Sequence, residues 1–109
     1  SSGALKALQD TVISCNALAM AALGRGNAVK CRSLLARAMG LATGARQPCS
    51  GLVVLTLNNT ACLFRRIGEP RQALRYLRRA VEVGEDTGSY EHLAVTHLNA
   101  CTVLSQLGR

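Results

Sequence analysis

Aromatic side chains are scarce in this 109-residue chain: Phe64, Tyr76 and Tyr90 are the only ones, and tryptophan is absent. A core must therefore be built from alanine, leucine, valine, isoleucine, methionine and cysteine. Such small side chains suit close packing of helices better than a thick β-sandwich. Few segments alternate with period two, and β-branched clusters are short, so the sequence predicts an all-α fold.

Long apolar runs are also missing, since no segment reaches the roughly 18 residues needed to span a bilayer. The longest candidates, 12–23 and 52–57, are too short or are broken by Ser14 and Asn16. No basic start followed by an apolar stretch marks a secretory signal. We therefore expect no membrane insertion and an intracellular, cytoplasmic location.

Catalytic motifs are absent as well. His92 and His97 do not form an HExxH pair, and the chain has neither a nucleophile elbow nor a phosphate-binding loop. His97 shares one face of an expected helix with Cys101 and Leu104. Because we expect that face to pack against the rest of the protein, His97 is predicted to be a core residue. We expect no enzymatic activity, no cofactor and no metal.

The five cysteines, at positions 15, 31, 49, 62 and 101, are odd in number and contain no CxxC pair. A disulfide framework or a zinc site would need a different spacing and a cluster of ligands. The pattern instead predicts buried free thiols in a reducing compartment.

Acidic residues are few, with six against 13 lysines and arginines, and the charge is segregated. Residues 25–46 carry five basic residues and no acid, and residues 65–79 carry six arginines against one glutamate. A basic middle attracts acidic peptides, nucleic acid or a membrane surface. We expect Arg71, Arg75, Arg78 and Arg79 to face solvent or to pair with Glu82.

A repeat emerges when the glycines are used as reference points. Gly26, Gly68 and Gly108 are separated by 42 and 40 residues. Small side chains recur at a fixed distance from these glycines, because Ala61 and Cys101 each lie seven residues before one. Asparagines recur in the same way, because Asn59 and Asn99 each lie nine residues before a glycine. Self-similarity at this period indicates a solenoid of stacked units.

Each unit is predicted to be a pair of helices, which gives helices over 4–23, 28–43, 50–67, 70–86 and 90–107. Asn27 and Ser89 are the expected N-caps, Gly68 ends the third helix, and Pro70 starts the fourth. The single expected domain, 1–109, thus contains one repeat over 4–44, a second over 50–88, and residues 89–109 as a first or capping helix. We expect Gly108 to be a turn signal and the chain to be a fragment of a longer array.

At these positions the chain resembles the tetratricopeptide repeat family. The residues that carry the resemblance are Ala61, Gly68, Ala73, Leu77 and Ala80. The stretch 57–108 is similar to the longer-period repeats of kinesin light chains, and the likeness is weaker over 4–44, where Cys31 replaces the usual alanine. The resemblance implies a right-handed superhelix, with first helices on a concave wall and second helices on the convex side.

A second stripe beside the packed one is predicted to line the concave groove. If Leu57, Ala61 and Phe64 pack, the neighbouring stripes of the three first helices hold the candidate site residues: Asn16, Met20, Asn58, Asn59, Cys62, Arg65, Arg66, Asn99, Thr102 and Gln106. Amides bind peptide backbone as donors and acceptors, and arginines pair with carboxylates. An alternative is that Asn59 and Asn99 hydrogen-bond between neighbouring helices and fix the repeat angle.

The favoured function is therefore a protein scaffold or adaptor whose groove binds an extended, acidic peptide segment of a partner. The light-chain resemblance adds an expected cytoskeletal association. One alternative is a scaffold that acts through self-association or subunit packing. Nucleic-acid binding is less favoured, because the proposed groove has no aromatic residues for base stacking and the repeat period exceeds that of helical RNA-reading repeats.

Overall fold

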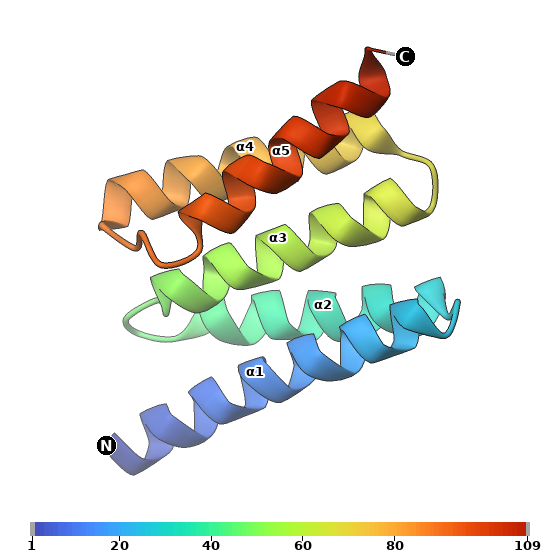
Figure 1. Cartoon of the computed structure of the whole chain (residues 1–109). Coiled ribbons are helices and arrows are strands. Elements are labelled where there is room, and N and C mark those ends of the chain that lie inside the picture. The colour runs from blue at the N-terminus through green and yellow to red at the C-terminus, as the bar shows by residue number, and fades with distance from the viewer. Residues whose placement is uncertain (1, 109) are drawn as a thin grey trace.

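The computed structural model describes residues 2–108 and contains five α-helices in that range (Figure 1). Their bounds are α1 Ser2–Gly24, α2 Ala28–Gly44, α3 Ser50–Arg66, α4 Pro70–Thr87 and α5 Leu93–Leu107. The first four agree with the predicted helices to within two residues at each end. The prediction of an all-α solenoid is confirmed.

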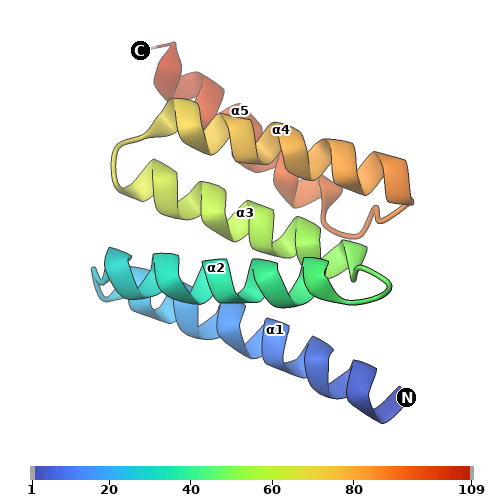
Figure 2. The same cartoon turned by 180° about the vertical axis from the view of Figure 1, so that it is seen from behind.

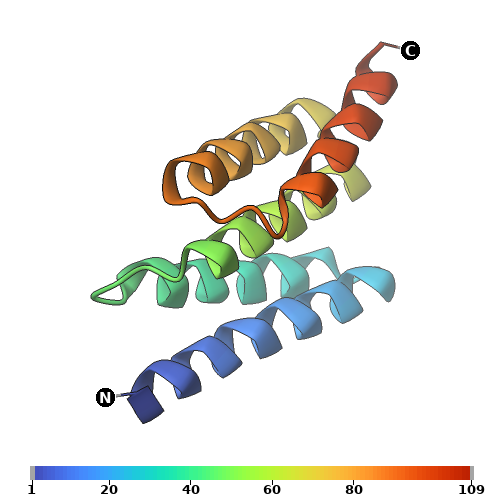
Figure 3. The same cartoon turned by 60° about the vertical axis from the view of Figure 1, so that its left-hand side comes forward.

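The helices form two layers. α1, α3 and α5 lie on one side of the molecule, and α2 and α4 lie on the other, where Figure 2 shows them in front. α3 packs against α4, its own second helix, and against α2 and α1 of the preceding repeat, and α5 packs against α4 and α3. Figure 3 shows the units stacked along one direction from the N-terminal to the C-terminal end. The molecule measures 50 × 31 × 17 Å.

The turns follow the expected capping chemistry. Asn27 Oδ1 accepts the backbone N–H of Lys30 at 3.1 Å and so caps α2. Gly68, with φ of 83°, takes the left-handed conformation that lets the chain leave α3, and Pro70 starts α4 without an unsatisfied N–H. Gly108 differs from Gly68, because its φ of −76° is right-handed and continues the helical path of α5.

Small side chains bring the helices close together. Leu57, Ala61 and Phe64 of α3 face Ala73, Leu77 and Ala80 of α4, and all six are buried. Three apolar clusters result: one joins α1 and α2 to Leu63 of α3, one joins α1 and α2 to α3 and Ala80 of α4, and one joins α3, α4 and α5. The packed stripe of Leu57, Ala61 and Phe64 that the sequence predicted is therefore confirmed, and the residues Ala73, Leu77 and Ala80 that carry the family resemblance form the stripe opposite it.

The start of α5 was predicted wrongly. The expected N-cap Ser89 instead donates its backbone N–H to Gly84 O at 2.9 Å, which completes the C-terminal turn of α4. Residues 88–92 then form the connection, and α5 begins at Leu93 after His92. The Ser89 hydroxyl accepts Thr87 Oγ1 of α4 at 3.2 Å, so its side chain is also directed to the end of α4 and not to the start of α5. None of the described helices has the length and apolarity required to cross a membrane.

Candidate functional site

We use the term first-helix face for the side of the molecule formed by α1, α3 and α5. All ten candidate site residues lie on these helices, but they differ in exposure. Two are buried, Asn16 and Asn58. Four are half-buried: Met20, Asn59, Cys62 and Asn99. Four are exposed: Arg65, Arg66, Thr102 and Gln106.

Asn16 joins α1 to α3. Its Nδ2 donates to Thr56 Oγ1 at 2.9 Å and to Val12 O at 3.0 Å, and its Oδ1 accepts Asn59 Nδ2 at 2.9 Å. Both polar atoms of a side chain that is only 2% exposed are therefore satisfied inside the protein. The bond from Asn59 is the interhelical contact that the alternative interpretation expected for that residue.

Asn58 makes the corresponding contact one repeat later. Its Nδ2 donates to Thr96 Oγ1 of α5 at 2.7 Å. Asn16 and Asn58 are 42 residues apart, and Thr56 and Thr96 are 40 apart, so the two pairs are equivalent. Asn58 Oδ1 is the one buried side-chain polar atom of the described residues without a hydrogen bond. The equivalent oxygen one repeat earlier, Asn16 Oδ1, accepts from Asn59, whose sequence equivalent is Asn99.

These amide–hydroxyl pairs hold successive first helices together. The sequence analysis missed Thr56 and Thr96, although their 40-residue spacing, which matches that of Asn59 and Asn99, was a usable signal. Each threonine also donates to a carbonyl, Leu52 O for Thr56 and His92 O for Thr96. Because the hydroxyl is fixed as a donor to its own helix, it accepts from the asparagine amide. Asn16 and Asn58 thus lie in helix contacts and not on an open surface.

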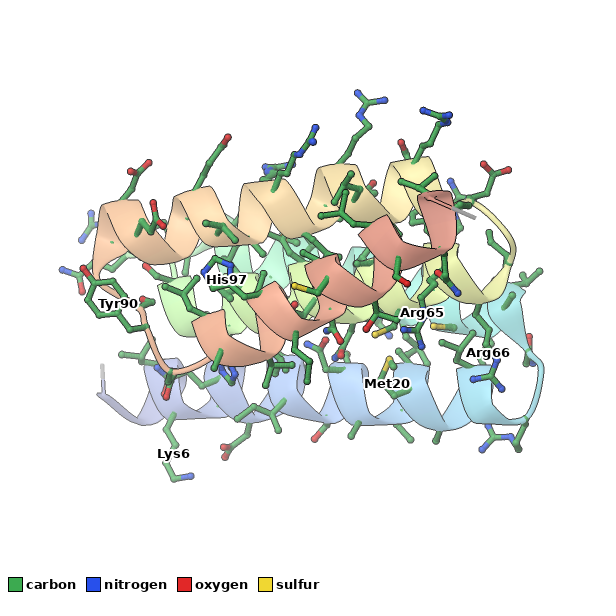
Figure 4. All side chains as sticks on the ribbon, turned by 45° about the horizontal axis from the view of Figure 1, so that its top comes forward. Lys6, Met20, Arg65, Arg66, Tyr90 and His97 are labelled. Atoms are coloured by element: carbon green, nitrogen blue, oxygen red, sulfur yellow. The ribbon has the colours of Figure 1, made fainter. Side chains whose placement is uncertain are left out.

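Two arginines at the end of α3 give the first-helix face its charge. Arg65 and Arg66 are exposed, and Figure 4 shows them with Met20 at the end of the molecule where α1 and α3 terminate. Within residues 2–108 neither guanidinium forms an ion pair, because the ion pairs there are Lys6–Asp10 and His92–Glu91. This positive charge is therefore uncompensated within the described chain.

Cys62 lies beside Arg65. Burial raises the pKa of the Cys62 thiol, and the nearby Arg65 charge offsets part of that rise. Burial also raises the pKa of Cys31, with a further contribution from Cys62. Both groups therefore remain protonated thiols near neutral pH, which makes them poor nucleophiles.

All five cysteines are free, as predicted, but their expected burial holds for only two. Cys15 and Cys31 are buried, Cys49 and Cys62 are half-buried, and Cys101 is exposed. No group of three or more potential ligands among the described residues could hold a metal ion.

The prediction that His97 is a core residue is wrong. His97, Cys101 and Leu104 are exposed, and α5 packs instead through Thr96, Ala100 and Val103. The prediction assumed that α5 packs through the positions equivalent to Leu57, Ala61 and Phe64 of α3, which are covered by α4. In residues 2–108 no helix covers the equivalent stripe of α5.

The arginines of α4 lie on the opposite side of the molecule. Arg71, Arg75, Arg78 and Arg79 are all exposed, as expected for a solvated face. Arg75 donates to Gln72 Oε1 at 3.4 Å. The alternative that Arg78 or Arg79 pairs with Glu82 is not observed among the described ion pairs.

Comparison with known proteins identifies the repeat. Neither the curated proteins nor the solved structures gave a match to the chain. The closer likeness to kinesin light chains stays a prediction, because the family match names no subtype. The family model of the tetratricopeptide repeat matches residues 11–86, well over half of the sequence, and the chain belongs to this family.

Proposed function

We propose that the chain is a non-catalytic protein-interaction module whose first-helix face holds an extended, acidic segment of a partner protein. Tetratricopeptide repeats in general mediate protein–protein interaction and scaffolding. The acidic character of the partner is our inference from the charge of the face. Five free thiols favour action in a reducing, intracellular compartment, where they would not be oxidised to disulfides.

The observation that carries the proposal is the pair of exposed guanidinium groups, Arg65 and Arg66, without acidic partners in the described chain. Guanidinium groups bind carboxylates with two parallel hydrogen bonds, which gives geometric specificity as well as energy. An exposed ion pair contributes about 0–1 kcal/mol, and a charge-assisted hydrogen bond that is partly desolvated contributes about 1.5–3 kcal/mol. Two such contacts are enough to select an acidic segment.

Polar groups along the same face would hold the backbone of that segment. Thr102 and Gln106 are exposed on α5, and Asn59 and Asn99 are half-buried between the first helices. Amide and hydroxyl side chains both donate and accept, so they serve a peptide in either polarity. Met20 and Cys62 pack against one apolar cluster and add a small apolar surface, with Cys62 close to Arg65.

A binding experiment tests the proposal with one pair of charge reversals. Fluorescence anisotropy would compare a peptide rich in glutamate with a matched peptide in which glutamine replaces glutamate. Arg66→Glu should weaken binding of the acidic peptide by about tenfold or more, which corresponds to about 1.4 kcal/mol. Arg71→Glu makes the same charge change on α4 and is the matched control. Equal losses from the two variants would show a general charge effect and refute the site.

Nucleic-acid binding is the second candidate, favoured by the exposed arginines of α4. Binding of that kind depends on release of counterions, so its affinity falls steeply and linearly on a double-logarithmic salt plot. A titration with single-stranded oligonucleotides of different sequence would measure this. Sequence-independent binding that Arg71→Glu weakens more than Arg66→Glu would favour nucleic acid over an acidic peptide.

A further inference from the structure

A pocket lies between the two hairpins, on the side of the molecule formed by α2 and α4 and opposite the first-helix face (Figure 2). Its volume is about 370 Å³, which is within the range of pockets that hold ligands in proteins. The lining includes Arg32 and Gly40 of α2, Thr60 and Phe64 of α3, and Tyr76 and Arg79 of α4. It is called the inter-hairpin pocket below.

The interior of the pocket is apolar, and its α2 wall is low. Leu57 and Leu63 line it and are at most 1% exposed. Ala36 and Gly40, one turn apart on α2, contribute little side-chain volume to the wall. A Cβ at Gly40 would meet no atom within 4 Å, so open space lies beside this residue. The pocket therefore has room for an apolar side chain next to Gly40.

Two guanidinium groups flank this apolar space from opposite walls. Arg32 of α2 lies over the Phe64 ring, 5.5 Å from its centroid, and this cation–π contact keeps it beside the pocket. Phe64 in turn stacks on Tyr76, with ring centroids 5.3 Å apart. Arg79 lies one turn after Tyr76 on α4. Both arginines are exposed, and neither is part of an ion pair within residues 2–108.

The threonines of the pocket supply hydrogen-bond acceptors. Thr60 Oγ1 donates to Thr56 O at 2.7 Å, and Thr43 Oγ1 donates to Met39 O at 2.7 Å. Because each hydroxyl has one proton and uses it within its own helix, only its lone pairs are available to a ligand. The pocket thus offers guanidinium donors for an anion, hydroxyl acceptors for an N–H group, and apolar surface between them.

We propose that the inter-hairpin pocket docks a short segment of a partner protein in which acidic residues flank one large apolar side chain. The apolar side chain fills the space beside Gly40. Carboxylates of the segment pair with Arg32 and Arg79, and its backbone N–H groups donate to Thr43 and Thr60. An apolar carboxylate such as a fatty acid has no N–H donor and would leave the threonine acceptors unused, so this set of groups favours a peptide.

The length of the pocket sets the length of the segment. The α2 residues that line it run from Arg32 to Thr43, which is a rise of about 16 Å along the helix. An extended chain advances about 3.3 Å per residue, so about five residues span the pocket. The pocket is on the opposite side of the molecule from Arg65 and Arg66, and the proposal goes beyond the peptide binding proposed for the first-helix face.

A peptide selection tests the proposal without a known partner. Random peptides displayed on phage would be depleted on Gly40→Leu and then selected on the complete 109-residue chain. Leucine fills the space beside Gly40, and the variant should fold because a Cβ there meets no atom within 4 Å. We expect the enriched peptides to share a large apolar residue next to glutamate or aspartate. Absence of enrichment, or enriched peptides without acidic residues, overturns the proposal.

Affinities of the enriched peptide, measured by fluorescence anisotropy, give a test that does not depend on Gly40. Arg79→Glu should weaken binding by about tenfold or more. Arg71→Glu makes the same charge change on α4 outside the pocket and should alter the affinity by less than about twofold. Gly44→Leu, which adds a leucine to α2 outside the pocket, should also be silent. Equal losses from Arg79→Glu and Arg71→Glu overturn the proposal.

The threonine acceptors distinguish a peptide from a small carboxylate. Thr60→Val removes the acceptor and should weaken the peptide by about fivefold, which corresponds to about one hydrogen bond. An unchanged affinity would contradict the proposed backbone contacts. Octanoate is the comparison ligand, because it has an apolar chain and a carboxylate but no N–H. If octanoate raises the melting temperature of the wild type but not of Gly40→Leu, and no peptide is enriched, the partner-segment assignment is wrong.

The two binding proposals can fail separately. Gly40 is remote from the first-helix face, so Gly40→Leu should leave the affinity for the glutamate-rich peptide of the earlier experiment unchanged. A variant that lost both affinities would show a general defect of the fold, and the inter-hairpin pocket would then have no specific ligand.

Discussion

The side-chain amide of Asn58 donates to the hydroxyl of Thr96 at 2.7 Å, and Asn16 makes the same bond to Thr56 at 2.9 Å one repeat earlier. These bonds join neighbouring first helices at a point where the apolar surfaces are small. A buried polar pair favours one register, because a slip would leave the asparagine amide without the hydroxyl that accepts from it. The repeat angle is therefore fixed by polar contacts as well as by the packing of alanines and leucines.

Asn16→Ala should destabilise the chain more than Asn58→Ala. Asn16 has three hydrogen-bond contacts and its removal leaves Asn59 Nδ2 without its partner, whereas Asn58 has one. We expect losses of about 2–3 kcal/mol and about 1 kcal/mol, respectively. Urea denaturation followed by circular dichroism would measure both free energies of unfolding.

The double variant Asn58→Ala with Thr96→Val completes this test. If the bond stabilises the stacking of α3 and α5, the two single changes should show a coupling energy of about 0.5–1.5 kcal/mol. Strict additivity, or an equal loss from Asn16→Ala and Asn58→Ala, would contradict the account of the stacking contacts.

Most of the fold could be predicted from the sequence because the repeat is encoded locally. Glycines mark the turns, and the alanine–leucine–alanine stripe of α4 depends only on residues of one helix. The beginning of α5 could not be predicted from such signals, since the loop 88–92 depends on Ser89 completing the hydrogen bonds of α4. A serine before a helix looks the same in sequence whether it ends one helix or starts the next.

The exposure of the candidate site residues was predicted less well than the helices, for a related reason. Helical periodicity shows that Asn58 and Arg65 share a stripe, but it does not show how far the next helix covers that stripe. α5 crosses α3 where it reaches Asn58 and leaves Arg65 exposed. Likewise, the prediction that His97 is buried assumed that another helix covers its side of α5. Exposure in a solenoid depends on the neighbouring repeat, which no single helix encodes.

Gly40→Ala and Gly84→Ala should have opposite effects on stability. Both glycines lie inside helices, where alanine is favoured by roughly 0.5–1 kcal/mol because it restricts the unfolded chain. A Cβ at Gly40 meets no atom within 4 Å, so we expect that full gain. A Cβ at Gly84 would lie 2.8 Å from Leu93 Cδ2 and 3.1 Å from the backbone oxygen of Ser89.

The close contacts of a Cβ at Gly84 should make Gly84→Ala destabilising, whereas Gly40→Ala is stabilising. Leu93 can move because its side chain is only half-buried, but the Ser89 carbonyl belongs to the turn that leads into α5. We expect Gly84→Ala to lose about 1–2 kcal/mol, as overpacked sites do. Thermal and chemical denaturation of both variants would measure the difference. A gain in stability at Gly84 would mean that α5 is not held tightly against the end of α4.

Cys31→Ala should reduce the loss of stability at alkaline pH. Burial raises the pKa of Cys31 in the folded chain above the ordinary thiol value, so the unfolded chain loses its proton first. The contribution of such a group is fully present below the unfolded pKa of about 8.5 and is lost as pH rises through the folded pKa. In that window the free energy of unfolding falls by up to about 1.4 kcal/mol per pH unit for each such thiol.

Alanine is a suitable replacement because it occupies the equivalent position, Ala73, in the second repeat. Urea denaturation between about pH 8 and pH 10 would give the slope for each protein. The wild-type slope should be steeper than that of Cys31→Ala, because only the wild type carries the buried Cys31 thiol. Identical slopes for wild type and Cys31→Ala would show that the Cys31 thiol ionises equally easily in the folded and unfolded chains, which would contradict the prediction.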